Sequence, residues 1–364
     1  MQSRTSLLTA AVTLAAAAAA HANTTYVQTN TGDQVAAGSL AIPDQPPRRI
    51  GGVVPGATEL YGFIAQPNEP GGDINIGVPG AEFDPLLSGA AQAFAGINSG
   101  NGFDIRGAQV VNGNILFAAG GNVGVYNYNI GANAVTQVLT GLEVAAATDA
   151  NDMTPNNLGD FQTYLPNGDV LFYDSSADSL LTTDGSTGNV SLFADSGALT
   201  GAIGNDIVSA LLVVGNTLFL GSDSNDTLFT LDLTDADPLD TASAVLDAAT
   251  LELVTGSTTA GFDGLVVQSD GTVTFYENRS DSIVSFNVSD PAGTAGVVLS
   301  SQDLIDGPMG NDLLTSLFVF QDEVYFFDAL GNASSPDDGI YQIIPEPASL
   351  GLLALGGLVL RRRR

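Results

Sequence analysis

The sequence predicts an all-β protein that forms one β-propeller of about six four-stranded blades, with five or seven blades as the neighbouring alternatives. Three observations predict this fold: an excess of Asp over Glu, β-type runs that recur around short turns, and a single repeat period along the chain. Of the 40 acidic residues, 32 are Asp and 8 are Glu. Because Asp favours turns and Glu favours helices, the chain should be rich in turns and poor in helix.

The first 22 residues predict a secretory signal peptide. Arg4 precedes an apolar run from Leu7 to Ala20, and Ala20-His21-Ala22 forms an Ala-x-Ala site before polar Asn23. A basic start, a short apolar segment and a small-residue site are the three parts of such a signal. We expect cleavage after Ala22, with a buried N-terminal helix as the alternative. Cleavage would remove His21, the only histidine of the chain.

A repeat of about 53 residues runs through the body of the chain. Its most regular feature is a β-type run with an aromatic residue, and these aromatic residues lie 47 to 56 residues apart: Phe117, Phe172, Phe219, Phe275 and Phe326, with a weaker copy at Tyr61. Each strong copy follows a turn, such as Asn112-Gly113 or Asp270-Gly271, and an earlier β-type run. Such a pair predicts a hairpin.

A third β-type run follows each hairpin, and a fourth is visible in most copies, for example at 135–139, 190–193 and 296–299. Four antiparallel strands in a unit of about 40 to 50 residues are typical of a propeller blade. Residues 23–344 number 322, which is room for about six units. The last unit ends at Ile344 without a fourth strand, so Thr25–Gln28 or a neighbouring N-terminal stretch is predicted to supply it. One or two β-sandwiches are the runner-up architecture.

Two segments predict short helical excursions in loops, namely residues 84–95 and 240–253. The segment between the second and third runs, as in residues 172–180, loosely resembles the NHL and YVTN types of propeller repeat. The resemblance extends over most of residues 50–344 and implies the fold only.

The C-terminus carries three features in order: Pro345-Glu346-Pro347, an apolar stretch of about 13 residues, and Arg361 to Arg364. As a helix the stretch would cover about 20 Å, short of the bilayer core of about 30 Å. Residues 345–364 resemble the PEP-CTERM sorting domain of Gram-negative bacteria. The resemblance implies recognition by an exosortase, transit to the cell surface and association with exopolysaccharide or biofilm matrix. An ordinary short anchor is the alternative. In either case only this tail should enter the membrane.

The composition excludes several kinds of chemistry. The chain has no Cys and no Lys, since all nine basic residues are Arg, so thiol nucleophiles, disulfides, Schiff bases and a P-loop lysine are ruled out. Residues 23–344 carry four Arg against 39 Asp and Glu, a formal charge of −35. Nucleic acid and anionic membranes are therefore poor partners for the body. The acidity fits a saline habitat, a matrix role or cation binding equally well.

One acidic position recurs with the repeat, 12 to 14 residues before each aromatic residue: Asp104, Asp160, Asp206, Asp263 and Asp312. We expect these five to enter the innermost strands at equivalent positions, around one end of the central channel. One interpretation is a metal site for a hard cation such as Ca²⁺. The other, which the repeat favours, is that each Asp accepts backbone hydrogen bonds at its own turn.

A second acidic set lies in the loops between the second and third runs: Asp174 and Asp178, Asp223 and Asp226, Glu277 and Asp281, Asp337 and Asp338. Solvated turns are the expected role, and weak peripheral Ca²⁺ sites the alternative. Arg106 and Arg279 are the two cations within the repeats. An ordinary salt bridge between Arg106 and Asp104 is the expected role of that pair, and an anion site at the mouth of the channel is the alternative.

Two functions follow from these features. The first is an exported surface or matrix propeller with a binding or structural role, whose partners are the secretion machinery, an exosortase and extracellular polysaccharide. The second is a secreted, metal-dependent hydrolase or lyase with its site at the mouth of the channel. The poverty of catalytic residue types favours the first.

Overall fold

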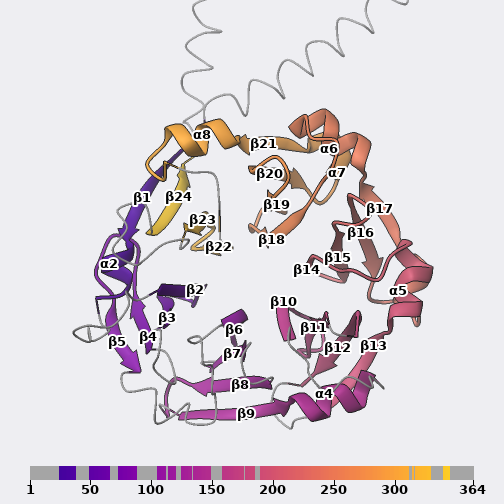
Figure 1. The fold of residues 1–364 in the computed structure, drawn as a ribbon, viewed down its shortest axis with the longest axis horizontal. Helices are drawn as coiled ribbons and strands as arrows, with labels where there is room; N and C mark the ends of the chain where they lie inside the picture. Colours follow the sequence, from indigo (N-terminus) through magenta and orange to yellow (C-terminus); the bar gives the residue numbers. More distant parts are fainter. Residues whose placement is uncertain are drawn as a thin grey trace, which may run out of the picture.

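The computed structural model describes residues 24–37, 49–65, 73–87, 105–111, 114–119, 124–132, 134–148, 158–175, 177–184, 189–310, 314, 316–328 and 339–344. They form six four-stranded antiparallel sheets arranged in a ring (Figure 1). The protein is therefore an all-β, six-bladed propeller, as predicted. We number the blades 1 to 6 around the ring and call the strands of each blade a to d, from the innermost outward.

Blades 1 to 3 come first along the chain. Their strands are β2 (Arg49–Pro55), β3 (Leu60–Ala65), β4 (Asp73–Gly77) and β5 (Asp84–Leu87) in blade 1; β6 (Ile105–Val111), β7 (Asn114–Ala119), β8 (Gly124–Asn129) and β9 (Ala134–Thr140) in blade 2; and β10 (Leu158–Tyr164), β11 (Val170–Asp174), β12 (Ser179–Thr183) and β13 (Val190–Ala194) in blade 3.

Blades 4 to 6 complete the ring. Their strands are β14 (Ala210–Val214), β15 (Thr217–Ser222), β16 (Thr227–Asp232) and β17 (Ser243–Leu246) in blade 4; β18 (Phe262–Val267), β19 (Thr272–Glu277), β20 (Ser282–Asn287) and β21 (Gly296–Leu299) in blade 5; and β22 (Ser316–Phe320), β23 (Glu323–Asp328), β24 (Gly339–Ile344) and β1 (Thr25–Thr31) in blade 6.

The N-terminal strand β1 closes the ring, as the sequence predicted. It pairs antiparallel with β24 over its full length, from Thr25 opposite Ile344 to Thr31 opposite Gly339. The innermost strands β2, β6, β10, β14, β18 and β22 then neighbour one another in sequence order, and β22 returns to β2. Closure removes the open sheet ends that would otherwise invite edge-to-edge aggregation.

Short helices connect the blades at the rim of the ring (Figure 1). They are α2 (Gly32–Val35), α4 (Gly141–Thr148), α5 (Ser196–Ile203), α6 (Ala248–Thr255) and α8 (Ser301–Asp306); α7 (Pro291–Thr294) and the 3₁₀ helix η1 (Pro238–Thr241) lie between strands c and d. The predicted helix at 84–95 is wrong over residues 84–87, which form β5, because pairing with β4 overrides local preference. Residues 88–95 lie outside the described residues. The prediction for 240–253 is correct only in part, since β17 lies between η1 and α6.

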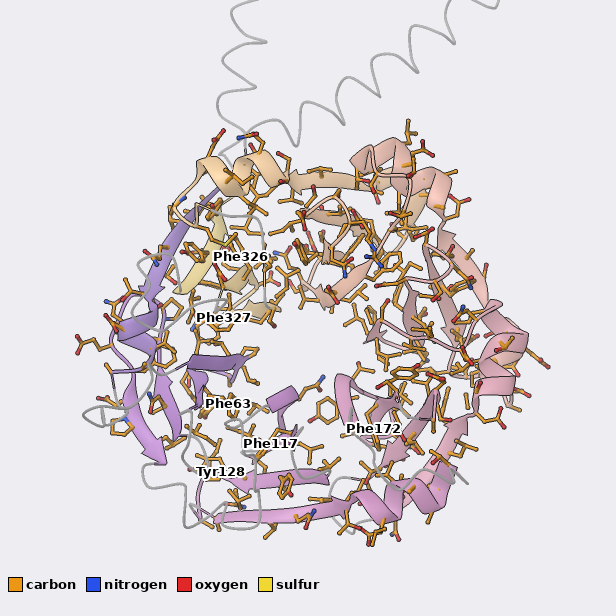
Figure 2. All side chains as sticks on the ribbon, in the orientation of Figure 1. Phe63, Phe117, Tyr128, Phe172, Phe326 and Phe327 are labelled. Carbon is orange, nitrogen blue, oxygen red and sulfur yellow. The ribbon has the colours of Figure 1, made fainter. Side chains whose placement is uncertain are left out.

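The core is divided into six apolar layers, one between each pair of neighbouring blades. The repeat aromatic residues lie on the b strands and are at most 2% exposed: Tyr61, Phe117, Phe172, Phe219, Phe275 and Phe326. Figure 2 shows Phe63, Phe117 and Tyr128 together at the border of blades 1 and 2. Phe117, Phe172, Phe275 and Phe326 pack toward the preceding blade, whereas Tyr61 and Phe219 pack toward the following one. The aromatic period of the sequence therefore marks the b strand of each blade, and the burial of these side chains between blades stabilises the ring.

The same irregularity occurs in the outer strand pair of every blade. A one-residue bulge in strand d precedes the residue that pairs with the start of strand c, for example Leu299 opposite Ile283 and Leu246 opposite Leu228. Blade 6 keeps this bulge, but there Asn30 occupies the d position, opposite Ile340. The closing strand thus follows the register of the five contiguous blades with one chemical exception.

Candidate functional site

The structure describes the side chains of only two of the five Asp residues predicted from the repeat. Asp104 and Asp312 lie outside the described residues, and Asp160 lies in β10 with its side chain outside them. Asp206 and Asp263 are described, and both are half-buried. Ala22, Pro345, Glu346, Pro347, Asp337 and Asp338 also lie outside the described residues, as do the predicted signal peptide and tail.

Asp206 joins three elements of the ring. Its Oδ2 accepts a hydrogen bond of 2.5 Å from Ser196 Oγ, at the start of α5. Its backbone carbonyl accepts a second bond, of 3.1 Å, from the hydroxyl of Tyr173 on β11. The residue therefore fastens the connection between blades 3 and 4. The donor to its carboxylate is a side-chain hydroxyl, whereas the sequence predicted backbone N–H groups of its own turn.

Asp263 lies within β18 and faces the turn after β19. Its Oδ2 accepts a hydrogen bond of 2.6 Å from Asn278 Nδ2. The next residue, Gly264, has φ of +62°, and a Cβ there would lie 3.2 Å from the backbone nitrogen of Leu317 in the next blade. Glycine therefore allows a bulge in β18 close to blade 6.

The expectation that the Asp positions are equivalent is wrong for this pair. Asp263 pairs with Tyr276 on β19, whereas the residue that pairs with the corresponding Gly221 on β15 is Ala210, four residues after Asp206. The bulge between Asp263 and Val266 lengthens β18, and β14 has none. Spacing along the sequence counts bulge and loop residues that pairing does not, so equal spacing did not give equal positions.

The second acidic set is not made of solvated turns throughout. Asp174 and Glu277 end strands β11 and β19, and they are 1% and 0% exposed. Glu277 accepts backbone hydrogen bonds from Gly261 at 2.7 Å, Arg279 at 3.1 Å and Ser280 at 2.8 Å. A buried carboxylate is costly unless donors surround it, and here its own turn provides two donors and Gly261, just before β18, provides the third. Glu277 is therefore a turn-forming residue.

The turn that follows each of these strands has a repeated design. Asp178, Asp226 and Asp281 have φ of 47°, 50° and 50°, a conformation that Asp tolerates better than most residues. Tyr173 donates to Asp178 at 2.8 Å, and Tyr276 donates to Asp281 at 2.7 Å. The signal for this pair was present in the sequence, as a Tyr five residues before an Asp, but our sequence reasoning missed it.

Blade 4 replaces the tyrosine of this turn with Gly221. A Cβ at Gly221 would lie 2.8 Å from the Cβ of Phe262, so the neighbouring blade occupies the space. Asp226 then accepts a hydrogen bond of 2.6 Å from the backbone of Ala260, and Asp223 accepts one of 2.8 Å from the backbone of Phe262. In this blade the acidic turn bonds to blade 5, so it joins two blades.

The electrostatics of the turns keep the tyrosines neutral. Burial raises the pKa of Tyr173, and its hydrogen bond to Asp178 raises it further. Burial also raises the pKa of Tyr164. Tyr173 therefore acts as a hydrogen-bond donor, and neither phenol supplies a base near neutral pH.

A depression of about 410 Å³ lies at the outer part of blade 4, where Thr217, Thr230, Asp232, Thr234 and Thr241 contribute to its lining. Asp232 Oδ1 accepts hydrogen bonds from the backbone and hydroxyl of Thr234, at 2.9 and 2.7 Å. These bonds lower the pKa of Asp232. The depression is polar, and its carboxylate bonds to its own loop.

Within the described ranges, no group of three or more Asp, Glu or His side chains lies close enough to hold a metal ion. Among the same residues, no helix is long and apolar enough to cross a bilayer. The Ca²⁺ site therefore stays a prediction.

No family model and no curated protein matches the chain. Solved structures do resemble it. One described as "Streptogramin B lyase structure" has a TM-score of 0.50 and 12% identity, and the match covers 89% of this chain and 99% of that one. YCF48 bound to D1 peptide has a TM-score of 0.50 and 10% identity, with 89% and 96% covered. The calcium-binding protein regucalcin from Agrobacterium tumefaciens has a TM-score of 0.49 and 12% identity, with 88% and 93% covered. At such identities the likeness shows the fold alone.

Proposed function

We propose that this chain is an exported β-propeller with a binding or structural role at the cell surface, or in the extracellular matrix, of a Gram-negative bacterium. The observation that carries the proposal is the pairing of Thr25 with Ile344. The two predicted processing sites, after Ala22 and at Pro345-Glu346-Pro347, flank this pair directly in the sequence. Removal of both end segments would leave every strand of the ring in place. This supports an exported propeller whose signal peptide and C-terminal sorting tail are not needed for its fold.

The contacts of the acidic residues support a binding role over a hydrolytic one. Asp206 and Asp263 each accept a hydrogen bond from a neighbouring side chain, and Glu277 accepts three from the backbone. These carboxylates are thus already engaged in hydrogen bonds that stabilise the ring. The metal-dependent hydrolase or lyase is the second candidate from the sequence, and it requires that Ca²⁺ stabilise the ring against unfolding.

The charge of the ring restricts its polymer partner. Residues 23–344 carry a formal charge of −35, so an anionic polysaccharide would be repelled unless cations lie between the two surfaces. We expect binding to a neutral glycan to be insensitive to EDTA, and binding to a uronate-rich polymer to require Ca²⁺. Co-sedimentation of the ring with each polymer, in Ca²⁺ and in EDTA, measures both. Failure to sediment with any extracellular polymer would contradict the glycan-binding role and favour a structural role that involves no glycan.

The sorting part of the proposal is tested by replacing Pro345-Glu346-Pro347 with three alanines in the full chain. We expect this variant to remain in the inner membrane of a host that has an exosortase, whereas the unaltered chain reaches the surface or the medium. Glu323→Ala, an exposed residue at the start of β23, is the matched control and should be sorted normally. Surface delivery of the triple variant would overturn the assignment.

A further inference from the structure

The two ends of the ring meet at one point of its rim. Thr25 begins β1, the outermost strand of blade 6, and pairs with Ile344, the last residue of β24. Helix α8 packs beside this point, because the hydroxyl of Tyr26 donates to the carbonyl of Leu304 at 2.6 Å and accepts from the backbone nitrogen of Met309 at 3.2 Å. Any tether at the C-terminal end of β24 therefore pulls on the rim of blade 6, beside α8.

The chain between this point and the predicted membrane segment is short. Three residues, Pro345 to Pro347, separate Ile344 from the apolar stretch of about 13 residues that ends at Leu360. Fully extended, three residues span at most about 11 Å at 3.3–3.6 Å each. A compact domain of this size has a radius of gyration of about 20 Å. Because the tether is shorter than that radius, it keeps the blade 6 rim closer to the lipid surface than the opposite rim.

From this geometry we infer that the tail-anchored chain sits against the lipid bilayer by the rim formed by the start of β1, the end of β24, and α8. The inference rests on the proposed function, since it takes the predicted sorting tail as the membrane anchor of the chain before that tail is removed. The bilayer is held there by the tether and not by charge, because Asp303 and Asp306 of α8 are exposed and would not attract anionic headgroups. The opposite rim, at α4, then points away from the membrane and is free to meet a polymer (Figure 1).

The test uses single cysteines, which are unambiguous because the chain has none of its own. Gln302→Cys places a thiol on an exposed position of α8. Leu142→Cys places one on α4, where the native side chain is 62% exposed, on the far side of the ring. The full chain is expressed in a Gram-negative host without exosortase, and spheroplasts are treated with a bulky polyethylene-glycol maleimide.

We expect Gln302→Cys to react several-fold more slowly than Leu142→Cys in the membrane-bound chain. In residues 1–344, which contain the whole ring and lack the tail, the two thiols should react at equal rates once exported. A small maleimide should label both positions equally in both chains, which controls for intrinsic thiol reactivity.

Equal reaction with the bulky reagent in a chain that resists carbonate extraction would overturn the inference and leave the anchor intact. A chain that carbonate removes from the membrane would instead overturn the proposed anchoring. Slow reaction of Gln302→Cys in residues 1–344 would show that a second copy of the chain covers this rim, which also overturns the inference.

Discussion

Blades 5 and 6 have the same architecture but are assembled from different parts of the chain. Blade 5 is contiguous, from Phe262 to Leu299, whereas blade 6 combines the last three strands with the first one. The outer strand of blade 5 has 4 residues and that of blade 6 has 7. A strand that returns from the far end of the chain meets a larger loop-closure entropy than one joined by a local turn. The contiguous blade 2 also has an outer strand of 7 residues, β9, so strand length alone does not distinguish the closing blade.

The two blades also differ at one equivalent buried position. Leu299 fills it in blade 5 with an apolar side chain that is 1% exposed, and Asn30 fills it in blade 6 with a side chain that is 0% exposed. Asn30 donates to the carbonyls of Val78 at 3.3 Å and Ala81 at 2.7 Å, and accepts from Gly80 at 3.1 Å. The closing strand is thus fastened to blade 1 by directional bonds at the position where blade 5 has the apolar side chain of Leu299.

The largest loss of stability should follow removal of the Tyr26 side chain. This residue of β1 is 3% exposed, and its ring lies 5.1 Å from that of Phe326 and 5.6 Å from that of Tyr341. We expect Tyr26→Ala to lower the free energy of unfolding by about 3–5 kcal/mol, as for other buried aromatic residues. Urea denaturation measures the loss, and Tyr26→Phe should recover most of it, with only about 0.5–1.5 kcal/mol missing for the hydroxyl. A loss below 1 kcal/mol for the alanine variant would mean that β1 does not close the ring.

Asn30→Leu tests the exception directly, because it gives blade 6 the residue of blade 5. We expect a loss of about 1–3 kcal/mol, since the variant leaves loop groups of blade 1 without their partners. Val78→Ala keeps the backbone carbonyl that Asn30 contacts and alters an exposed side chain, so it should be nearly neutral. Stabilisation by Asn30→Leu would show that packing, and not the bonds to blade 1, limits the closure.

The N-cap of α6, between the contiguous blades 4 and 5, is a local interaction that can be compared with the ring-closing contacts of β1. Asp247 caps this helix and accepts bonds of 2.8 Å from the backbone and 2.7 Å from the hydroxyl of Thr250. Asp247→Ala should cost about 1 kcal/mol, the usual value for a lost N-cap. Thermal unfolding followed by circular dichroism checks it. An effect as large as that of Tyr26→Ala would mean that local capping, and not ring closure, controls cooperative unfolding.

The predicted Ca²⁺ site can be tested on the same ring. Because Asp206 and Asp263 already accept hydrogen bonds, we expect Asp206→Asn and Asp263→Asn to change stability by less than about 1 kcal/mol, equally in Ca²⁺ and in EDTA. A cation that binds only the folded ring at 100 times its Kd would add about 2.7 kcal/mol. A Ca²⁺-dependent rise in Tm that these variants abolish would establish the metal site and favour the metal-dependent hydrolase or lyase as the function of the chain.

The smallest effect should come from the exposed contact between blades 5 and 6. Asp322 accepts bonds of 2.7 Å from the backbone and 2.6 Å from the hydroxyl of Ser269, and these bonds hold its pKa below the ordinary 3.8. The stabilisation should therefore be present above about pH 4 and be lost as the pH falls through the lowered pKa. The Tm difference between the unaltered chain and Asp322→Ala should narrow on acidification. A difference that widens would reverse the sign of the interaction.

The sequence by itself determined the class of the fold, the blade number and the part of the chain that closes the ring. The reason is that Phe117, Phe172, Phe219, Phe275 and Phe326 each lie on the second strand of a blade, so a repeated buried strand is visible as a period in residues even though Phe219 packs on the other side of its blade. Ile344 ended the last repeat one strand short, so the missing strand had to come from elsewhere.

Only the tertiary structure decided how the acidic residues are used. Asp206 and Asp263 have nearly the same sequence spacing, but a bulge in β18 gives them different positions. The sequence predicted Glu277 to be a solvated turn residue, but in the structure backbone N–H groups of Gly261 and Ser280 donate to its buried carboxylate. In the sequence Asn30 is an ordinary polar residue of a strand, and only the structure shows that it donates to the carbonyl of Ala81 in blade 1. Hydrogen bonds between segments distant in sequence depend on register and approach, and neither leaves a periodic mark in the chain.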